Sequence, residues 1–239
     1  MTTNSVKILD INFINTTFNQ FTNQLHKRID QHQKTFVVTA NPEIVMYAKQ
    51  HPSYKKIIQT ADFITADGTG IVMGSKIIKD PLPERITGFD LFINLLTWGN
   101  QHHKSVYLLG SKPEVIKKVV QKVQQNYPNL KIIGFNDGYF KDDTPIIEKI
   151  KAGQPDMVFV ATGFPKQEEF IYHNQHLANG LWMGIGGSFD VLAGNVKRAP
   201  QIWQKMHLEW LYRVIKEPSR ITRLSVLPKY LKLVIKQKR

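Results

Sequence analysis

Short apolar runs alternate along the chain with segments in which apolar residues recur every three or four positions. Six of these runs end in glycine, proline or polar turn residues, as strands do: residues 36–42, 61–68, 105–111, 131–138, 156–165 and 181–187. Between them lie helical patterns such as residues 113–128, where Val115, Val119 and Val123 share one face. Strand and helix therefore alternate over most of the chain.

This alternation predicts an α/β fold, a Rossmann-like and mostly parallel sheet with helices on both faces, because the strands are almost continuously apolar. Residues 6–15 form a shorter β-rich piece, which we expect to be a hairpin at the sheet edge. After Gly194 the strand signals end and the pattern becomes helical. We therefore predict an α/β core over residues 1–195 and a basic helical C-terminal appendage over residues 196–239.

Composition narrows the class of protein. The chain has 239 residues, 42% of them hydrophobic, which is ordinary for a globular protein. It contains no cysteine, which excludes disulfides, thiolate nucleophiles and cysteine-ligated metal sites. The N-terminus lacks a secretory pattern, and no window reaches the roughly 18 apolar residues of a spanning helix, so we expect a cytoplasmic protein.

Positive charge is concentrated at the C-terminal end. The net charge is +13, and residues 201–239 carry ten Lys or Arg against two Glu, a net +8. Such a basic segment predicts an anionic partner: nucleic acid, anionic lipid headgroups or a diphosphate. Composition alone does not choose among them.

Polar residues stand where several predicted strands end. In TANPEIV, Thr39 and Asn41 are two positions apart, so both point to one face if the strand continues that far. Asn41 also suits the N-cap of a helix that begins at Pro42. From the residues alone, helix capping and ligand contact are equally good interpretations.

The segment FITADGTGIV poses the same question for Asp67, which follows a strand and precedes two glycines. An acid at such a place most often makes an Asx turn or caps a helix. Gly68, Gly70 and Gly74 also suggest a dinucleotide-binding loop, although their spacing is not G-x-G-x-x-G. A carboxylate presented for a reaction is the third interpretation.

Three further turns carry groups that suit a phosphate or sugar ligand. Arg85 lies in the loop PLPERITG, where a lone arginine is usually solvated. In GFPKQEEF, Lys166 and Gln167 open a helix, which suits a phosphate, although a capped surface helix fits equally well. In GIGGSFDVLAG, Asp190 could accept from ribose hydroxyls, or the turn could be only tightly packed.

Several common sites are absent from the sequence. It has no D-x-D pair, no H-E-x-x-H and no G-x-x-x-x-G-K-[ST], so it supports neither a metal-bound diphosphate, a zincin site nor a nucleotide P-loop. We therefore expect no metal and no other cofactor. Cationic side chains and helix N-termini would then neutralise any diphosphate that leaves.

Four motifs together resemble one family. TANPEIV, TADGTGIV, GFPKQEEF and GGSFDVLAGNVKRAP are similar, in this order and spacing, to the WecG/TagA/CpsF glycosyltransferases, glycosyltransferase family 26. The likeness covers nearly the whole chain and is strongest to the TagA/TarA branch of wall teichoic acid synthesis. It implies an inverting transfer of N-acetylmannosamine from a UDP donor to the 4-hydroxyl of N-acetylglucosamine on undecaprenyl diphosphate, which forms a β-1,4 linkage.

The resemblance also implies roles for particular residues. It implies that Asp67 is the general base and Arg85 an active-site arginine, and that Thr39, Asn41 and Gln167 line the sugar-nucleotide pocket. In the family the appendage is said to close over the active site and to bind the membrane. The arginines that it would direct at the substrate diphosphates are Arg213, Arg220 and Arg223.

The expected partners follow from this activity: a UDP-sugar, a polyprenyl-diphosphate-linked N-acetylglucosamine and the anionic inner face of the cell membrane, with no nucleic acid. A core without its closed appendage could also hide apolar surface in a homo-oligomer. Three alternatives stay open at this point. They are a related donor such as UDP-N-acetylmannosaminuronic acid, a nucleic-acid-binding protein that uses its basic tail, and a nicotinamide-dependent oxidoreductase that uses the glycines after Asp67.

Overall fold

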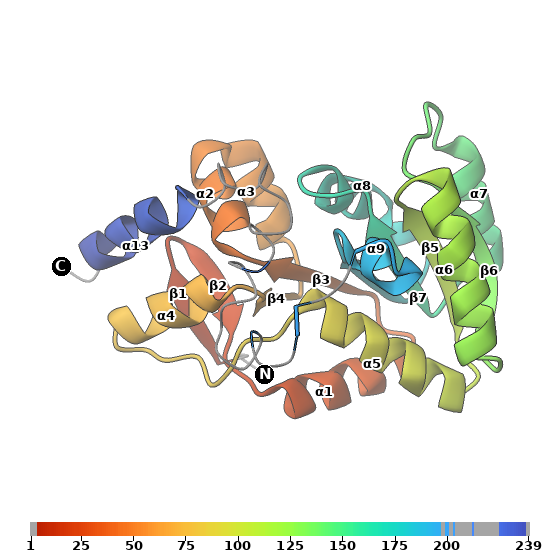
Figure 1. The fold of residues 1–239 in the computed structure, drawn as a ribbon, viewed down its shortest axis with the longest axis horizontal. Helices are drawn as coiled ribbons and strands as arrows, with labels where there is room; N and C mark the ends of the chain where they lie inside the picture. The colour runs from red at the N-terminus through yellow and green to blue at the C-terminus, as the bar shows by residue number, and fades with distance from the viewer. Residues whose placement is uncertain (1–3, 197–198, 201–202, 204–211, 213–224, 238–239) are drawn as a thin grey trace.

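Six parallel strands form the central sheet of the computed structural model, which describes residues 4–196, 199–200, 203, 212 and 225–237 (Figure 1). Their order across the sheet is β4-β3-β8-β7-β5-β6. The strands are β3 Thr35–Ala40, β4 Phe63–Ala66, β5 Ser105–Gly110, β6 Lys131–Asn136, β7 Met157–Ala161 and β8 Leu181–Gly184. Each lies within a run predicted from the sequence except that β3 begins one residue earlier, and all neighbours are parallel. The predicted α/β sheet is confirmed.

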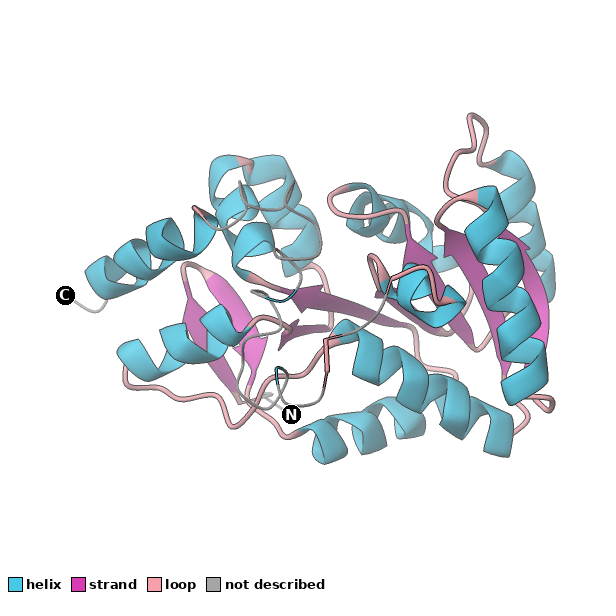
Figure 2. Ribbon diagram, in the orientation of Figure 1, coloured by secondary structure: helices cyan, strands magenta, loops and turns pink. Residues whose placement is uncertain are grey.

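Helices cover both faces of the sheet (Figure 2), because alternate residues of a strand point to opposite sides. On β7, Met157 and Phe159 belong to one apolar core, and Val158 and Val160 belong to the other. The helices on the first core are α1 Phe18–Asp30, α5 Gly88–Gln101, α6 Pro113–Asn126 and α9 Ser188–Ala193. Those on the second are α2 Pro42–Gln50, α3 Pro52–Gln59, α4 Thr69–Ile77, α7 Thr144–Gly153, α8 Lys166–Asn174 and α13 Val226–Gln237; the short 3-10 helix η1 Gln175–Leu177 follows α8.

The direction of the chain across the sheet reverses between β5 and β7. From β5 the chain passes through α6 to β6 at one edge, whereas from β7 it passes through α8 to β8, toward the other edge. In open parallel sheets, ligands bind outside the carboxyl ends of the strands where such a reversal occurs. The ends of β5 and β7 are therefore the first place to look for a ligand site.

The N-terminal β-rich piece forms the expected hairpin, made of β1 (Ser5–Ile8) and β2 (Ile11–Ile14). Leu9 and Asp10 connect the strands with φ angles of 47° and 67°, the left-handed conformation of a tight two-residue turn. The hairpin is a two-stranded sheet of its own, and β2 packs against the edge strand β4. It thus covers an edge that would otherwise be open to pairing with another chain.

Helix α13 is the described end of the predicted appendage, and it packs on α2 and α4. Tyr230 at its centre is fully buried. At its far end, the Gln237 side chain accepts from the Leu9 N–H at 2.7 Å and donates to the Lys7 carbonyl at 2.9 Å. The end of the chain is therefore fastened to the N-terminal hairpin.

Most of residues 196–224 lie outside the described part of the chain, so the division at residue 195 stays a prediction. Two isolated described residues there, Trp203 and Tyr212, have ring centroids 5.8 Å apart. No helix within the described ranges is long and apolar enough to cross a membrane.

Candidate active site

Asp67 and Asn41 follow neighbouring strands at the carboxyl edge of the sheet. The register pairs Ala40 of β3 with Ala66 of β4, and the Asp67 N–H extends this ladder by donating to the Ala40 carbonyl at 3.0 Å. Asn41 keeps an extended backbone, with φ −109° and ψ 176°, so strand geometry does persist past Thr39 as the predicted shared face requires. Asp67 and Asn41 therefore lie side by side.

Asn41 performs the helix-capping role that its position suggested. Its Oδ1 accepts a hydrogen bond from the Ile44 N–H at 3.0 Å, and Pro42 occupies the first turn of α2. Capping uses the carbonyl oxygen of the amide, while an asparagine amide also carries two N–H donors. Capping and ligand contact are thus compatible roles for this side chain.

The loop that carries Arg85 is fixed against the end of β4. The Ile86 N–H donates to the Ala66 carbonyl at 2.9 Å, and the Thr65 hydroxyl donates to the Ile86 carbonyl at 3.4 Å. Because Arg85 precedes Ile86 and Asp67 follows Ala66, these bonds bring the backbones of the two charged residues together. Both residues are partly exposed.

Thr39 lies deeper than its neighbours, at 8% exposed. Its hydroxyl donates to the Gly184 carbonyl of β8 at 3.4 Å. It also faces the start of α5, since a Cβ at Gly88 would lie 2.9 Å from Thr39 Oγ1. Thr39 therefore joins three elements beneath the strand ends, and its predicted contact with a ligand stays a prediction.

The glycines after Asp67 serve close packing. A Cβ at Gly68 would lie 2.6 Å from the Pro42 Cδ atom, and one at Gly70 would lie 2.6 Å from the Leu227 Cδ1 atom of α13. Gly74 in turn faces the Tyr230 hydroxyl. A dinucleotide loop needs that space for a pyrophosphate, so the oxidoreductase interpretation is not favoured. The N-cap of α4 is Gly68, so Asp67 does not cap this helix either.

The turn GFPKQEEF places Lys166 and Gln167 at the start of α8. Lys166 is exposed, whereas Gln167 is only 4% exposed and sits over the end of β8. The Gln167 Oε1 accepts from the Gly186 N–H at 3.0 Å, and its Nε2 donates to Glu168 Oε1 at 2.7 Å. Sequence reasoning missed Glu168, because two adjacent acids in a polar segment look like solvated surface.

Asp190 lies at the reversal between β5 and β7. Its Oδ2 accepts from the Ser111 hydroxyl at 3.4 Å, and Ser111 follows β5 with a positive φ of 59°. The Ser111 carbonyl accepts from the Gly138 N–H at 2.8 Å, which draws in the loop after β6. Next to it, Tyr139 is 70% exposed, an unusual position for a large aromatic side chain. Polar, glycine-rich and aromatic groups thus converge here.

The remaining predicted positions cannot be placed. Arg213, Arg220 and Arg223 lie outside the described residues. Within the described part of the chain, no group of three or more His, Asp or Glu side chains could hold a metal ion.

Comparison of the sequence with known proteins shows the family of the chain. The family model described as "Glycosyl transferase WecG/TagA/CpsF family" matches residues 6–239. The chain belongs to the WecG/TagA/CpsF glycosyltransferase family. The resemblance found in the four strand-end motifs is therefore confirmed.

Three relatives of this glycosyltransferase are named N-acetylglucosaminyldiphosphoundecaprenol N-acetyl-beta-D-mannosaminyltransferase. A protein of Bacillus spizizenii is 44% identical over 97% of this chain and 91% of its own length. One of Bacillus subtilis is 42% identical over the same shares. One of Staphylococcus aureus is 41% identical over 99% of this chain and 94% of its own length.

Proposed function

We propose that this glycosyltransferase moves N-acetylmannosamine from UDP-N-acetylmannosamine to the 4-hydroxyl of N-acetylglucosamine on undecaprenyl diphosphate, inverting the anomeric centre to form a β-1,4 linkage for wall teichoic acid. The observation that carries the proposal is the near full-length match, at 41–44% identity, to relatives named for this transfer. The arrangement at the strand ends is consistent with it.

Asp67 is the proposed general base. Inverting transfer in one displacement requires a group within hydrogen-bond reach of the attacking hydroxyl to take its proton. The main-chain bond from Asp67 to Ala40 holds the backbone of this residue at the strand ends beside Asn41. An acceptor hydroxyl that enters over the carboxyl edge of β3 and β4 would come near Asp67.

Arg85 and Lys166 are the proposed counter-charges for the leaving UDP. Arg85 is bound through Ile86 to the end of β4, and Lys166 is exposed in the first turn of α8, where the helix N-terminus adds partial positive charge. We add Arg213, Arg220 and Arg223 to this set on the family resemblance alone. With these cations in place of a metal ion, turnover should persist in EDTA.

The nucleoside of the donor is proposed to bind at the β5–β7 reversal. Asp190 and Ser111 can accept from and donate to ribose hydroxyls, and the exposed Tyr139 ring offers a face for the uracil base. This places UDP between Asp190 at one end and Lys166 at the other. The sugar then points toward Asp67 and Arg85.

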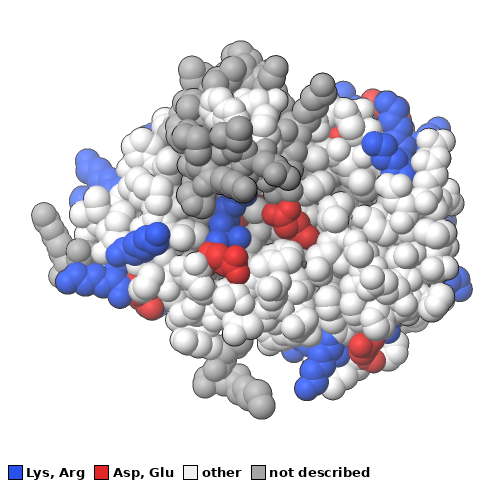
Figure 3. All heavy atoms as spheres, turned by 60° about the horizontal axis from the view of Figure 1, so that its bottom comes forward, with Lys and Arg blue, Asp and Glu red and all other residues white. Residues whose placement is uncertain are grey.

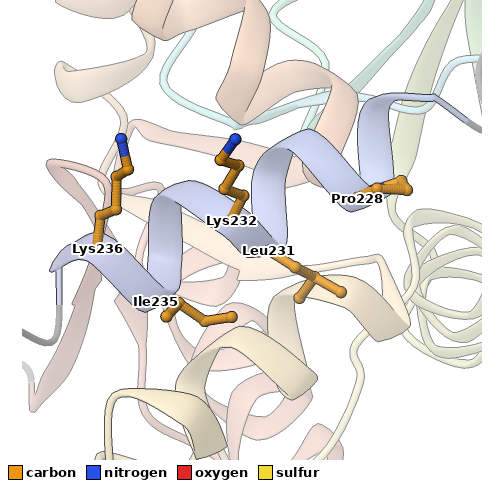
Figure 4. A pocket seen from close by; sticks show the side chains of 5 residues that line it. All are labelled: Pro228, Leu231, Lys232, Ile235 and Lys236. Atoms are coloured by element: carbon orange, nitrogen blue, oxygen red, sulfur yellow. The ribbon is translucent and has the colours of Figure 1, made fainter.

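Helix α13 is proposed to contribute to contact with the membrane that holds the acceptor. Lys232 and Lys236 project from one side of the helix, and Leu231 and Ile235 from the other (Figure 4). Ile235 is 48% exposed, and both lysines are exposed. All residues around the shallow depression there belong to this one helix, so it is not a ligand cavity.

Nucleic acid is the alternative partner for a basic chain, and we do not propose it because the relatives are named for a transfer to a lipid-linked sugar. On the face shown in Figure 3, the described basic and acidic side chains are interspersed and much of the surface carries no charge. A phosphate backbone binds instead along a continuous basic stripe.

The test is a donor screen in which release of UDP is measured with a lipid-linked N-acetylglucosamine acceptor. We expect UDP-N-acetylmannosamine to give acceptor-dependent release and UDP-N-acetylmannosaminuronic acid to give much less. Faster release from the uronic acid donor would reassign the donor. Binding of both substrates without release of UDP would refute the transferase proposal.

A further inference from the structure

Glu168 is a buried acid that the mechanism above does not use. It lies in the first turn of α8 and is 1% exposed. Burial raises the pKa of this carboxyl to about 7. An apolar side chain of similar volume would fill such a place at no electrostatic cost. The acid therefore calls for an explanation in its contacts.

Glu168 accepts a hydrogen bond from Gln167, which directly follows Lys166, the proposed phosphate contact at the start of α8. Glu168 Oε1 accepts from Gln167 Nε2 at 2.7 Å, and Gln167 Oε1 accepts from the Gly186 N–H at 3.0 Å. The Gln167 amide also lies against β8, because a Cβ at Gly184 would be 2.7 Å from its Nε2. One amide therefore spans the space between a buried carboxyl and the glycine turn.

The orientation of that amide matters, because its two ends differ only in being a donor or an acceptor. The Gly186 N–H needs an acceptor. If the Gln167 side chain turned over, its NH₂ group would face the Gly186 N–H, donor against donor. Glu168 prevents this, since it offers an acceptor to the other end of the amide.

Tyr54 on α3 is the other polar neighbour of Glu168, and the interaction with its hydroxyl lowers the Glu168 pKa against the larger effect of burial. The Tyr54 hydroxyl on α3 is near enough that the Glu168 charge helps to raise its pKa, after burial as the main cause. Yet neither Tyr54 Oη nor Glu168 Oε2 has a partner of hydrogen-bond geometry among the described residues. Glu169 also influences the Glu168 pKa from its own helix.

We propose that Glu168 is a positioning residue: by accepting from Gln167 Nε2, it fixes the Gln167 oxygen on the Gly186 N–H and so holds the glycine turn 184–187 in the shape that binds the UDP donor. This role rests on the proposed function, because the turn matters only if the nucleotide binds beside it. No contact between Glu168 and substrate is required.

The test compares Glu168→Met with Glu168→Gln, because the two replacements separate volume from hydrogen bonding. Methionine fills the site but accepts no strong hydrogen bond. Glutamine keeps an acceptor oxygen for Gln167 and can direct its NH₂ group at Tyr54 Oη. Glu169→Gln is the matched control, since it removes a neighbouring charge that does not contact Gln167. UDP affinity is measured by calorimetry, with donor KM, kcat and Tm for each purified variant.

We expect Glu168→Met to bind UDP about tenfold more weakly, because the Gln167 amide can then turn over and the glycine turn no longer keeps the shape that binds the nucleotide. Donor KM should rise more than kcat falls, while Tm stays close to that of the wild type. Glu168→Gln should regain most of the affinity, and Glu169→Gln should match the wild type.

Two outcomes would overturn the proposal. One is wild-type UDP affinity in Glu168→Met. The other is equal loss of affinity and of Tm in both Glu168 variants, which would show a purely structural role. If the wild type binds UDP but transfers no N-acetylmannosamine, the donor assignment fails, and the UDP affinities still decide the role of Glu168.

Discussion

Backbone hydrogen bonds hold the main chain of Asp67 at the end of β4. Its N–H continues the β3–β4 ladder, and the next bond, from Ile86 to Ala66, brings the Arg85 loop alongside. A backbone held in this way leaves only side-chain rotations to be fixed when a substrate binds, which helps to keep a base in reach of a hydroxyl. Residue-level predictions therefore begin with Asp67.

Replacing Asp67 by Asn should abolish most turnover without unfolding the protein. Asparagine keeps the shape and the backbone bond but cannot take a proton at neutral pH, so we expect kcat to fall by roughly 10²–10⁴-fold, the usual contribution of a general base. The measurement is kcat together with Tm. Asp80→Asn, at an exposed position after α4, is the control and should retain full activity. Near-normal turnover of Asp67→Asn would remove Asp67 from this role.

The raised pKa of Glu168 leads to a separate prediction, on how the free energy of unfolding changes with pH. Burial raises its pKa from 4.5 to about 7 in the folded protein. Between these values the folded state keeps a proton that the unfolded chain has released, so the free energy of unfolding decreases as the pH rises through this window. Glu168→Gln should flatten that decrease in urea unfolding measured at several pH values, whereas Glu169→Gln should not. Parallel curves for wild type and Glu168→Gln would contradict the assignment.

The sequence predicted which polar residues follow the strands but not which side chains they contact. Asn41, Asp67 and Gln167 follow from an apolar run that ends in a polar residue and a turn. Glu168 could not be separated in this way from Glu169, because only the packing of α3 on α8 buries one and leaves the other partly exposed. Helical spacing gave one available signal, since Glu168 and the buried Ile171 lie one turn apart.

At the scale of elements, α13 docks on the glycines of α4. Gly70 admits Leu227, and Gly74, one turn later, admits the Tyr230 ring. These glycines follow Asp67 directly, so the helix that begins beside the proposed base is the one on which the end of the chain rests. Two segments more than 150 residues apart in sequence meet there, which no local pattern could predict.

This packing predicts a compensating pair of substitutions. Gly74→Ala should lower the free energy of unfolding or displace α13, because the new Cβ collides with the Tyr230 hydroxyl. Tyr230→Phe removes that hydroxyl, which is buried with no hydrogen-bond partner among the described residues, so it should be neutral or stabilising by up to about 1 kcal/mol.

The double variant should therefore recover part of the stability lost by Gly74→Ala. The measurement is a double-mutant cycle by urea unfolding, in which contacting residues couple by about 0.5 kcal/mol or more. Strict additivity of the two changes would show that Tyr230 does not occupy the space above Gly74.

For the whole molecule, charge is distributed unevenly along the chain. Figure 1 shows α13 at one end of the molecule and α7 at the other. Residues 201–239 carry a net +8 of the total +13, and α13 with Lys229, Lys232 and Lys236 is the described helix of this segment. We therefore expect an anionic bilayer to attract the end of the molecule that includes α13. Counting charged residues along the sequence predicted a basic C-terminal segment. The fold shows where α13, the described helix of that segment, lies.

Removal of the α13 lysines should weaken binding to anionic vesicles. Lys229, Lys232 and Lys236 are exposed, and each basic residue near an anionic surface contributes about 1 kcal/mol, so replacing all three by Gln should reduce the partition coefficient by roughly 100-fold at low salt. The control replaces three exposed lysines at the α7 end: Lys141, Lys149 and Lys151. Vesicle sedimentation measures both variants. Equal loss from both would point to net charge rather than to α13 as the membrane-binding feature.

The central claim is tested most directly by the product itself. The purified protein is incubated in EDTA with UDP-N-acetylmannosamine and a vesicle-bound, diphosphate-linked N-acetylglucosamine lipid, and the glycolipid is examined by mass spectrometry and NMR. The account predicts a lipid heavier by one N-acetylhexosamine, with a β-1,4 linkage, one UDP per sugar transferred, and no product from Asp67→Asn. An α-linked product, a product made only when a divalent metal is added, or no glycolipid at all would contradict it.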